Sequence, residues 1–252
     1  MDIHRPKAAH SVREFVIEIG TIICGILIAL GLEQAVETLH WSHKVEAARE
    51  ALREELSSAA YSAQERLALK GCLESRLDKL EASLATSGNY WAGQPWTRYA
   101  GSLLNEGAAY GAPIRNWDTG VWRSLVADGT AAHFPRDEML RLTAVYQFID
   151  NVREQNGHER AQLAPVAALG RSFSLSQTAR DTIRVAVEEQ REMNRLAALG
   201  GAQIADSIRR AEMGPASPLW LKRIKGLQRY AEDCDAGRPT RFNSDGYPAD
   251  QA

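Results

Sequence analysis

The chain has 252 residues, of which 30 are lysine or arginine and 32 are aspartate or glutamate, so its formal net charge is -2. Hydrophobic residues make up 44% and charged residues 25%, which supplies a folded core and excludes an intrinsically disordered chain. The charge balance gives no basic footprint for nucleic acid, and three cysteines exclude a disulfide-dense miniature scaffold.

The most apolar segment of the chain is 15–32, FVIEIGTIICGILIALGL, with Glu18 as its one charged residue. A helix of this length measures roughly 27 Å, close to the hydrocarbon thickness of a bilayer, about 30 Å. We therefore predict a retained transmembrane helix over 15–32. Two alternatives stay open: a cleaved secretory signal, and a buried helix of a soluble domain.

The basic residues around this segment predict its orientation. Arg5, Lys7 and Arg13 precede it, whereas 33–43 contains no lysine or arginine. Because positively charged flanks stay inside, we expect a cytoplasmic N-terminus over 1–14 and a C-terminal body across the inner membrane. In a Gram-negative host this compartment is the periplasm.

Small residues recur every four positions within the predicted span, at Thr21, Gly25 and Ala29. This spacing lets two helix backbones approach closely, so it predicts pairing of the membrane helices in a homodimer. The alternative is that these residues only relieve crowding.

The helical pattern continues over 33–86 as a predicted stalk. Small or apolar residues recur there with a mean step of about 3.5 residues, the period of a coiled-coil seam. They are Val45, Ala48, Leu52, Leu56, Ala59, Ala63, Leu67, Leu73, Leu77, Leu80 and Leu84. A homodimer could pair through this stripe as well, but the stripe could equally pack on a later helix of the same chain.

Capping residues and breakers predict further helices in a body over 87–236. The first is expected over 118–129, capped by Asp118 or Thr119 and ended by Gly129 in the left-handed conformation. The second is expected over 135–170, either straight or bent around Gly157 or Pro165. The third is expected to start at Ser174 or Ser176 and to reach 213, and the last covers 218–235. Alternation typical of a strand lasts nowhere beyond four residues, and 237–252 reads as a flexible tail. The predicted fold is all-α: the membrane helix continues into a long stalk helix, which packs with an antiparallel helical bundle.

Cys72 lies on the predicted stalk and Cys234 near the end of the last helix. In an oxidising compartment the two can form a disulfide that ties the last helix to the first. The alternative is two unpaired buried thiols.

The segment that follows the stalk is rich in tryptophan and tyrosine. Because these side chains suit surfaces that are apolar at one end and wet at the other, they form a candidate ligand groove. Its residues are Trp96, Tyr99, Trp117 and Trp122. Core packing between helices is the competing interpretation.

The sequence predicts no metal, cofactor or catalytic site. Glu37, His40, His43 and Glu46 are spaced by three, but steps of three drift around a helix, so only adjacent pairs share a face. Nucleophile-elbow, P-loop, dinucleotide-binding and zinc-protease motifs are absent from the sequence. We therefore expect that the protein is not an enzyme.

Four features of the sequence carry a resemblance to a known group of proteins. They are the stretch EFVIEIGTIICGILIALGLEQAVE at 14–37, the run CLESRLD at 72–78, the tryptophans of 117–122 and the HFP sequence at 133–135. Together they resemble a group of single-pass inner-membrane proteins of alphaproteobacteria. No activity is established for that group, so the resemblance implies a location and a layout but no catalytic residues.

The expected function is that of a membrane-anchored periplasmic helical protein that binds or scaffolds. Its expected partners are the lipid bilayer and a second copy of the chain, with no nucleic acid and a protein partner that the sequence does not identify. One alternative is a sensory or ligand-binding bundle that uses the aromatic segment and acts through a partner protein. A third hypothesis is an envelope hydrolase built from scattered carboxylates.

Overall fold

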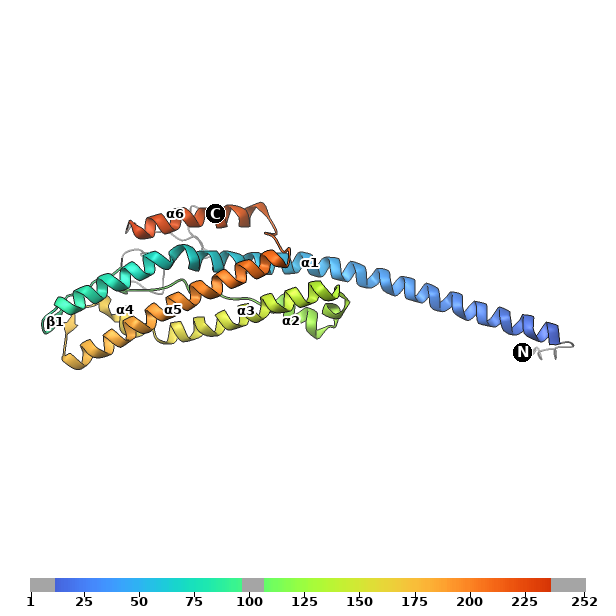
Figure 1. The fold of residues 1–252 in the computed structure, drawn as a ribbon, viewed down its shortest axis with the longest axis horizontal. Helices are drawn as coiled ribbons and strands as arrows, with labels where there is room; N and C mark the ends of the chain where they lie inside the picture. Colours follow the sequence, from blue (N-terminus) through green and yellow to red (C-terminus); the bar gives the residue numbers. More distant parts are fainter. Residues whose placement is uncertain (1–11, 97–106, 237–252) are drawn as a thin grey trace, which may run out of the picture. The chain divides into compact units, whose positions relative to one another are not determined.

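The computed structural model of the chain describes residues 12–96 and 107–236 (Figure 1). The predicted flexible tail at 237–252 lies outside these residues. The longer helices are α1 (Val12–Thr86), α2 (Gly120–Ala127), α3 (Arg136–Ala161), α5 (Gln177–Arg210) and α6 (Pro218–Asp235). The short elements are α4 (Ala164–Ala167), the 3-10 turns η2 (Thr130–His133) and η3 (Ala168–Gly170), and the strands β1 (Tyr90–Trp91) and β2 (Phe173–Ser174). The all-α prediction is confirmed.

The chain divides into two compact units, residues 1–47 and 48–252. In the first unit, the predicted span and the beginning of the stalk belong to one uninterrupted helix, α1. Among the described residues, α1 is the helix that is long and apolar enough to cross a membrane, and its apolar window is not buried at all.

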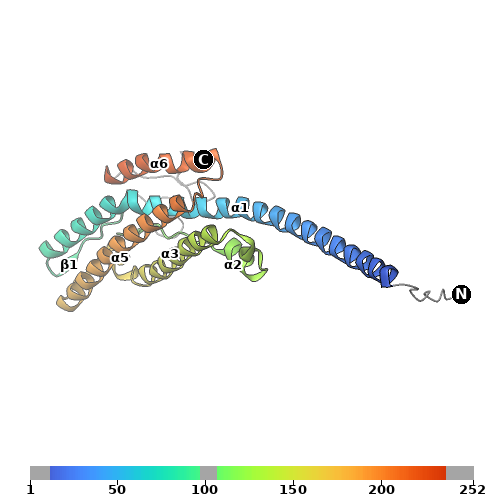
Figure 2. The same cartoon turned by 45° about the vertical axis from the view of Figure 1, so that its right-hand side comes forward.

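In the second unit, the leucines of α1 form the centre of the core. Seven of them are completely buried: Leu52, Leu56, Leu69, Leu73, Leu77, Leu80 and Leu84. Both views show α6 on one side of this part of α1, with α3 and α5 on the other (Figures 1 and 2). The partner of the predicted stripe is therefore the same chain.

The stripe departs from the prediction at Leu67, which is only half-buried, while its neighbours Glu65 and Arg66 are buried. A single-seam coiled coil buries one narrow face of a helix. Because α1 is covered from more than one side, it also buries residues outside the seam, and three of these, Glu55, Glu65 and Arg66, are charged.

The end of α1 is capped by a residue from the start of α5. Arg180 donates from Nη2 to the carbonyl oxygens of Ser87 (2.7 Å) and Gly88 (2.8 Å), and from Nη1 to the carbonyl oxygen of Leu84. A cation at a helix C-terminus satisfies unpaired carbonyl groups and complements the helix dipole.

A two-residue antiparallel pair, β1 with β2, lies close to this cap and pairs Trp91 with Phe173. Trp91 is fully buried, and its Nε1 donates to the carbonyl oxygen of Leu169 at 2.7 Å. The chain that leaves α1 is thereby fixed against the chain that enters α5.

Several predicted boundaries are confirmed. α1 ends at Thr86, and α6 begins at Pro218. Gly129, two residues after α2, has a φ of 81°, the left-handed conformation that glycine adopts without cost. The side chain of Ser176 caps α5 by accepting from the backbone N–H of Ala179 at 3.1 Å.

One predicted helix is divided and one predicted end is wrong. The helix expected over 135–170 breaks near Pro165, one of the two positions where a bend was expected. α3 stops at Ala161, Pro165 lies in the first turn of α4, and η3 ends at Gly170. The helix expected to reach Met213 ends at Arg210, since Glu212 adopts a left-handed φ of 59°.

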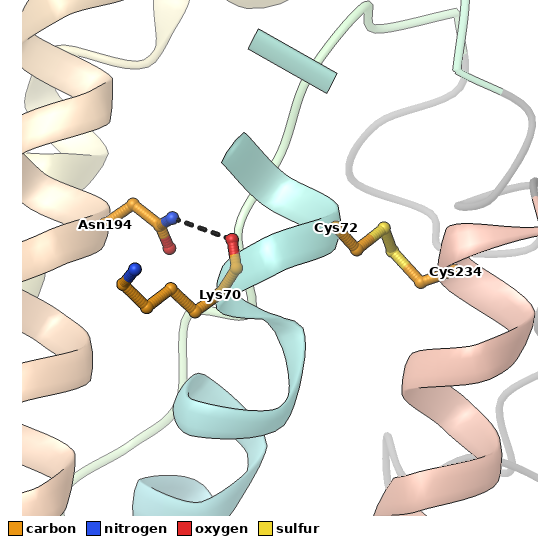
Figure 3. Close-up of a disulfide and its surroundings, with 4 residues drawn as sticks. All are labelled: Lys70, Cys72, Asn194 and Cys234. Atoms are coloured by element: carbon orange, nitrogen blue, oxygen red, sulfur yellow. Dashed lines mark hydrogen bonds between the residues drawn. A yellow bond between two sulfur atoms is a disulfide. The ribbon is translucent and has the colours of Figure 1, made fainter. Parts of the chain in front are cut away.

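A disulfide joins Cys72 of α1 to Cys234 of α6, with their Cα atoms 5.9 Å apart (Figure 3). On α5, Asn194 donates from Nδ2 to the carbonyl oxygen of Lys70 at 3.1 Å. α1 is thus tied covalently to α6 and by a partly buried hydrogen bond to α5.

The packing of α5 on α1 predicts a strong effect of one methyl group. A Cβ added at Gly201 would lie 2.8 Å from the carbonyl oxygen of Ala63, a backbone atom. We expect Gly201→Ala to lower the free energy of unfolding by about 1–3 kcal/mol, measured by urea denaturation in mild detergent. Gly71→Ala, also within a helix but with open space around its Cβ, is the matched control and should be neutral or slightly stabilising. Equal stability of the two variants would contradict this packing.

Candidate functional site

A groove of about 440 Å³ lies in the second unit, a volume typical of ligand pockets. Arginines dominate its lining. We call it the arginine groove and define it by Arg115, Arg123, Arg153, Arg160, Trp117 and Asn156.

Three structural elements supply these residues. Arg153, Asn156 and Arg160 occupy α3 at steps of three and four residues, which places them on one face of that helix. Arg123 comes from α2. Arg115 and Trp117 come from the irregular segment before α2.

A buried carboxylate on α1 holds Arg115. Glu65 is completely buried and accepts from Nε of Arg115 at 2.7 Å and from Nη2 at 2.8 Å. Burial by itself lowers the pKa of Arg115, but the hydrogen bond and the charge of Glu65 outweigh it, and the pKa is raised above its usual value. The guanidinium therefore stays charged and fixed in position.

A second series of contacts fixes the wall of the groove that Trp117 and Asn156 form. Nη2 of Arg66 lies 2.7 Å from Oε1 of Glu159, and both side chains are at most 2% exposed. Asn156 donates to Oε2 of Glu159 at 3.4 Å and accepts from Nε1 of Trp117 at 2.7 Å. The wall formed by Trp117 and Asn156 is thus anchored on a buried ion pair.

The N-terminus of α2 is capped by a residue from α1. Glu55 accepts from the backbone N–H of Val121 at 2.8 Å and of Trp122 at 3.3 Å. The sequence predicted Asp118 or Thr119 for this role. Asp118 accepts from the N–H of Gly120 at 2.9 Å, whereas the side chain of Thr119 makes no capping bond.

Glu55 also accepts a hydrogen bond from the hydroxyl of Tyr146 on α3, at 2.6 Å. Burial, followed by the hydrogen bond and the charge of Glu55, raises the pKa of Tyr146 far above its usual value. The hydroxyl therefore remains a neutral donor to the carboxylate at physiological pH.

This contact predicts a pH dependence. Because the folded pKa of Tyr146 is raised, its contribution is complete below the unfolded value, about pH 10, and is lost as the pH rises above it. We expect Tyr146→Phe to cost about 1.5–3 kcal/mol at neutral pH, the range for hydrogen bonds to charged groups. Urea denaturation between pH 7 and 11 should show the gap between wild type and variant closing above pH 10. A gap that stays constant or widens would contradict the assignment.

The arginines of the groove differ in how their charges are compensated. Arg153 pairs with Asp150 at 2.6 Å and donates to Oγ1 of Thr119 at 3.0 Å. Arg123 and Arg160 are exposed and have no carboxylate partner among the residues that the structure describes. Asp118 is the carboxylate among the described lining residues, so arginine charges outnumber carboxylate charges in the groove.

The structure does not bring the predicted aromatic groove together as one site. Trp117 lines the arginine groove, whereas Trp122 stacks on Tyr146 with ring centroids 5.0 Å apart. Trp96 stacks on Tyr110 at 6.1 Å and lines a separate cavity. The fourth predicted residue, Tyr99, lies outside the described residues.

The separate cavity measures about 260 Å³ and lies beside the disulfide. Arg76 lines it and donates to the carbonyl oxygens of Ala109 (2.8 Å) and Gln94 (2.5 Å). Burial lowers the pKa of Arg76. The contacts of Arg76 bind two backbone segments of the chain, so we assign this residue a structural role.

The residues predicted to pair membrane helices lie on the exposed surface of α1. Thr21 donates to the carbonyl oxygen of Ile17 at 2.9 Å, and a Cβ at Gly25 would meet no atom within 4 Å. Ala29 is likewise exposed. Within the described part of the chain, no group of histidine, cysteine, aspartate or glutamate side chains could hold a metal ion.

Sequence reasoning selected the tryptophans of this region but missed the arginines. Arg153 and Arg160 recur on one face of a helix that was expected, so the charge pattern of that helix was the available signal. Comparison of the chain with protein-family models, with curated proteins and with solved structures finds no match.

Proposed function

We propose that this chain is a single-pass inner-membrane protein whose N-terminus is cytoplasmic and whose helical body lies in the periplasm. It acts by binding or scaffolding and not by catalysis. The observation that carries this proposal is the apolar segment of α1, none of which is buried.

The exposed side chains of that segment favour a lipid environment. Ile22, Leu27 and Ile28 are 57%, 62% and 64% exposed. Each such side chain left in water forfeits roughly 1–2 kcal/mol that burial of its exposed part in an apolar phase would supply. A bilayer supplies that phase for the whole segment at once.

The location of the body is supported by two features that do not depend on hydrophobicity. The bond between Cys72 and Cys234 fits an oxidising compartment such as the periplasm. The lysine and arginine residues before the span, and their absence from 33–43, fit a cytoplasmic N-terminus. The resemblance to alphaproteobacterial single-pass proteins supports the same layout.

Fusions test the orientation directly. Alkaline phosphatase, which becomes active only after export, and green fluorescent protein, which fluoresces in the cytoplasm, are each joined after residue 45 in a bacterial host. We expect an active phosphatase fusion and a dark fluorescent fusion. The reverse pattern would refute the proposed topology.

A homodimer through Thr21, Gly25 and Ala29 is part of the same proposal. Cys24 is an exposed thiol next to Gly25 on the membrane helix. Because adjacent residues of a helix point about 100° apart, Cys24 lies off the face of Gly25, so the interface is tested with Ala29→Cys in a Cys24→Ser chain. Oxidation of native membranes should cross-link two copies through the introduced thiol, and Gly25→Leu should abolish the product. Undiminished cross-linking in that variant would argue against this interface.

A second candidate function is a ligand-binding or sensory bundle that acts through a partner protein. The arginine groove favours it, because a concave site with converging polar groups is the usual form of a binding pocket. The two candidates are compatible, since a membrane-anchored body can carry such a groove.

A further inference from the structure

We infer that the arginine groove binds a phosphate group, carried either by a small soluble phosphate compound or by a lipid headgroup. The inference rests on the proposed binding role and names the ligand class. Four arginines line the groove, and Asp118 is the carboxylate among its described lining residues.

The charges of the groove favour phosphate over a simple carboxylate. The charges of Arg115 and Arg153 are partly met by Glu65 and Asp150, but Arg123 and Arg160 have no carboxylate partner in the described part of the chain. A monocarboxylate would neutralise only one of those two charges. A phosphate monoester carries a charge of about -1.5 to -2 at neutral pH and offers three acceptor oxygens, so it can neutralise the charges of both Arg123 and Arg160.

The hydrogen-bonding geometry of arginine suits the same group. A guanidinium presents its donors in a planar fork that bonds two oxygens of a phosphate at once. Asp118 is negatively charged and would repel an anion in the groove. Its Oδ1 already accepts a hydrogen bond from the N–H of Gly120 at 2.9 Å, which reduces that repulsion.

The groove is also held in shape before any ligand arrives. Arg115 is fixed by two hydrogen bonds to the buried Glu65, and Trp117 is fixed through Asn156. A preformed site loses less conformational entropy on binding than one that must be ordered by its ligand. Binding therefore needs only the side chains of Arg123 and Arg160 to close on the phosphate.

The test is isothermal titration of the purified full chain in nonionic detergent, with pyrophosphate as the first probe. The variants are Arg123→Gln, Arg160→Gln and the double variant. Arg136→Gln is the matched control, because Arg136 is an exposed arginine of α3 outside the groove. Thermal unfolding of each variant verifies that the fold is intact.

We expect wild type and Arg136→Gln to bind pyrophosphate equally. Each single groove variant should bind about tenfold more weakly, the loss typical of one charge-assisted contact, and the double variant about a hundredfold more weakly. The inference is overturned if wild type does not bind pyrophosphate at millimolar concentration. It is equally overturned if the double variant binds like wild type.

Further probes separate the sources of the phosphate. Dihexanoyl phosphatidic acid is a water-soluble lipid, and dihexanoyl phosphatidylcholine is its zwitterionic control. Tighter binding of the phosphatidic acid than of pyrophosphate, dependent on Arg160, would assign a lipid headgroup; the opposite order would assign a soluble compound. Citrate that binds as tightly as pyrophosphate would refute the preference for phosphate.

The titration uses protein in detergent, so its result does not depend on membrane topology. A failed titration with an active phosphatase fusion would refute the ligand and keep the location. Phosphate binding together with an inactive phosphatase fusion would support the ligand and refute the location.

Discussion

Replacement of Cys72 and Cys234 together by serine should lower the free energy of unfolding by about 2–5 kcal/mol. The two cysteines are 162 positions apart, and the chain-entropy model gives roughly 5 kcal/mol for closing so long a loop, with measured values often smaller. The bond also holds α6 on α1, so its loss should free the last helix first.

Urea denaturation in mild detergent, followed by tryptophan fluorescence, measures this effect. Oxidised wild type should unfold at higher urea than both reduced wild type and the double serine variant. Cys24→Ser is the control, because Cys24 is an exposed free thiol and its loss should leave the transition unchanged. A wild-type midpoint that is the same with and without reductant would show that the bond contributes nothing.

The second large effect is expected at the buried ion pair of Arg66 and Glu159. Glu159→Ala removes the carboxylate and leaves a guanidinium that is 1% exposed without its partner. We expect this variant to lose about 3–5 kcal/mol of stability, the usual penalty for an uncompensated buried charge. Trp117 should also lose its fixed position, because Asn156 contacts Glu159.

The double variant Arg66→Met with Glu159→Leu separates the charge from the packing. Because both charges disappear, most of the lost stability should return. Nε of Arg66 has no hydrogen-bond partner in the described part of the chain, so the wild-type pair is not ideally satisfied. Glu154→Ala is the control, since this exposed glutamate lies on the same helix, and it should change stability by less than about 0.5 kcal/mol. A double variant less stable than Glu159→Ala would contradict this explanation.

Local rules predicted much of the fold. Ser176 and Pro218 begin helices where their capping and backbone properties indicate, and Gly129 follows α2 in the left-handed conformation that it was predicted to adopt. The spacing of apolar residues also predicted the buried face of α1. These features depend on neighbours within a few residues, so one sequence contains the information.

The candidate site depends on contacts between distant parts of the chain. Glu55 caps α2 from 66 positions away, and Arg180 caps α1 from 93 positions beyond Ser87. Glu65 positions Arg115 across 50 residues. Neither spacing nor propensity indicates such pairs, because the paths of the segments that connect the helices decide which side chains meet.

Long-range packing also explains why the tryptophans of the predicted groove lie apart. Trp96, Trp117 and Trp122 were grouped by composition, yet each packs in a different place in the structure. Aromatic residues fill cores as readily as they line grooves, so their clustering in sequence does not identify a ligand site.

The central claim is that α1 crosses the membrane and carries the body to the periplasm. Spheroplasts that express the chain with an N-terminal epitope tag are treated with external protease and examined by immunoblotting. We predict that protease added outside shortens the tagged chain to a fragment of the N-terminus and span, while the tag survives. A full-length chain that is degraded only after the spheroplasts are lysed would contradict the claim.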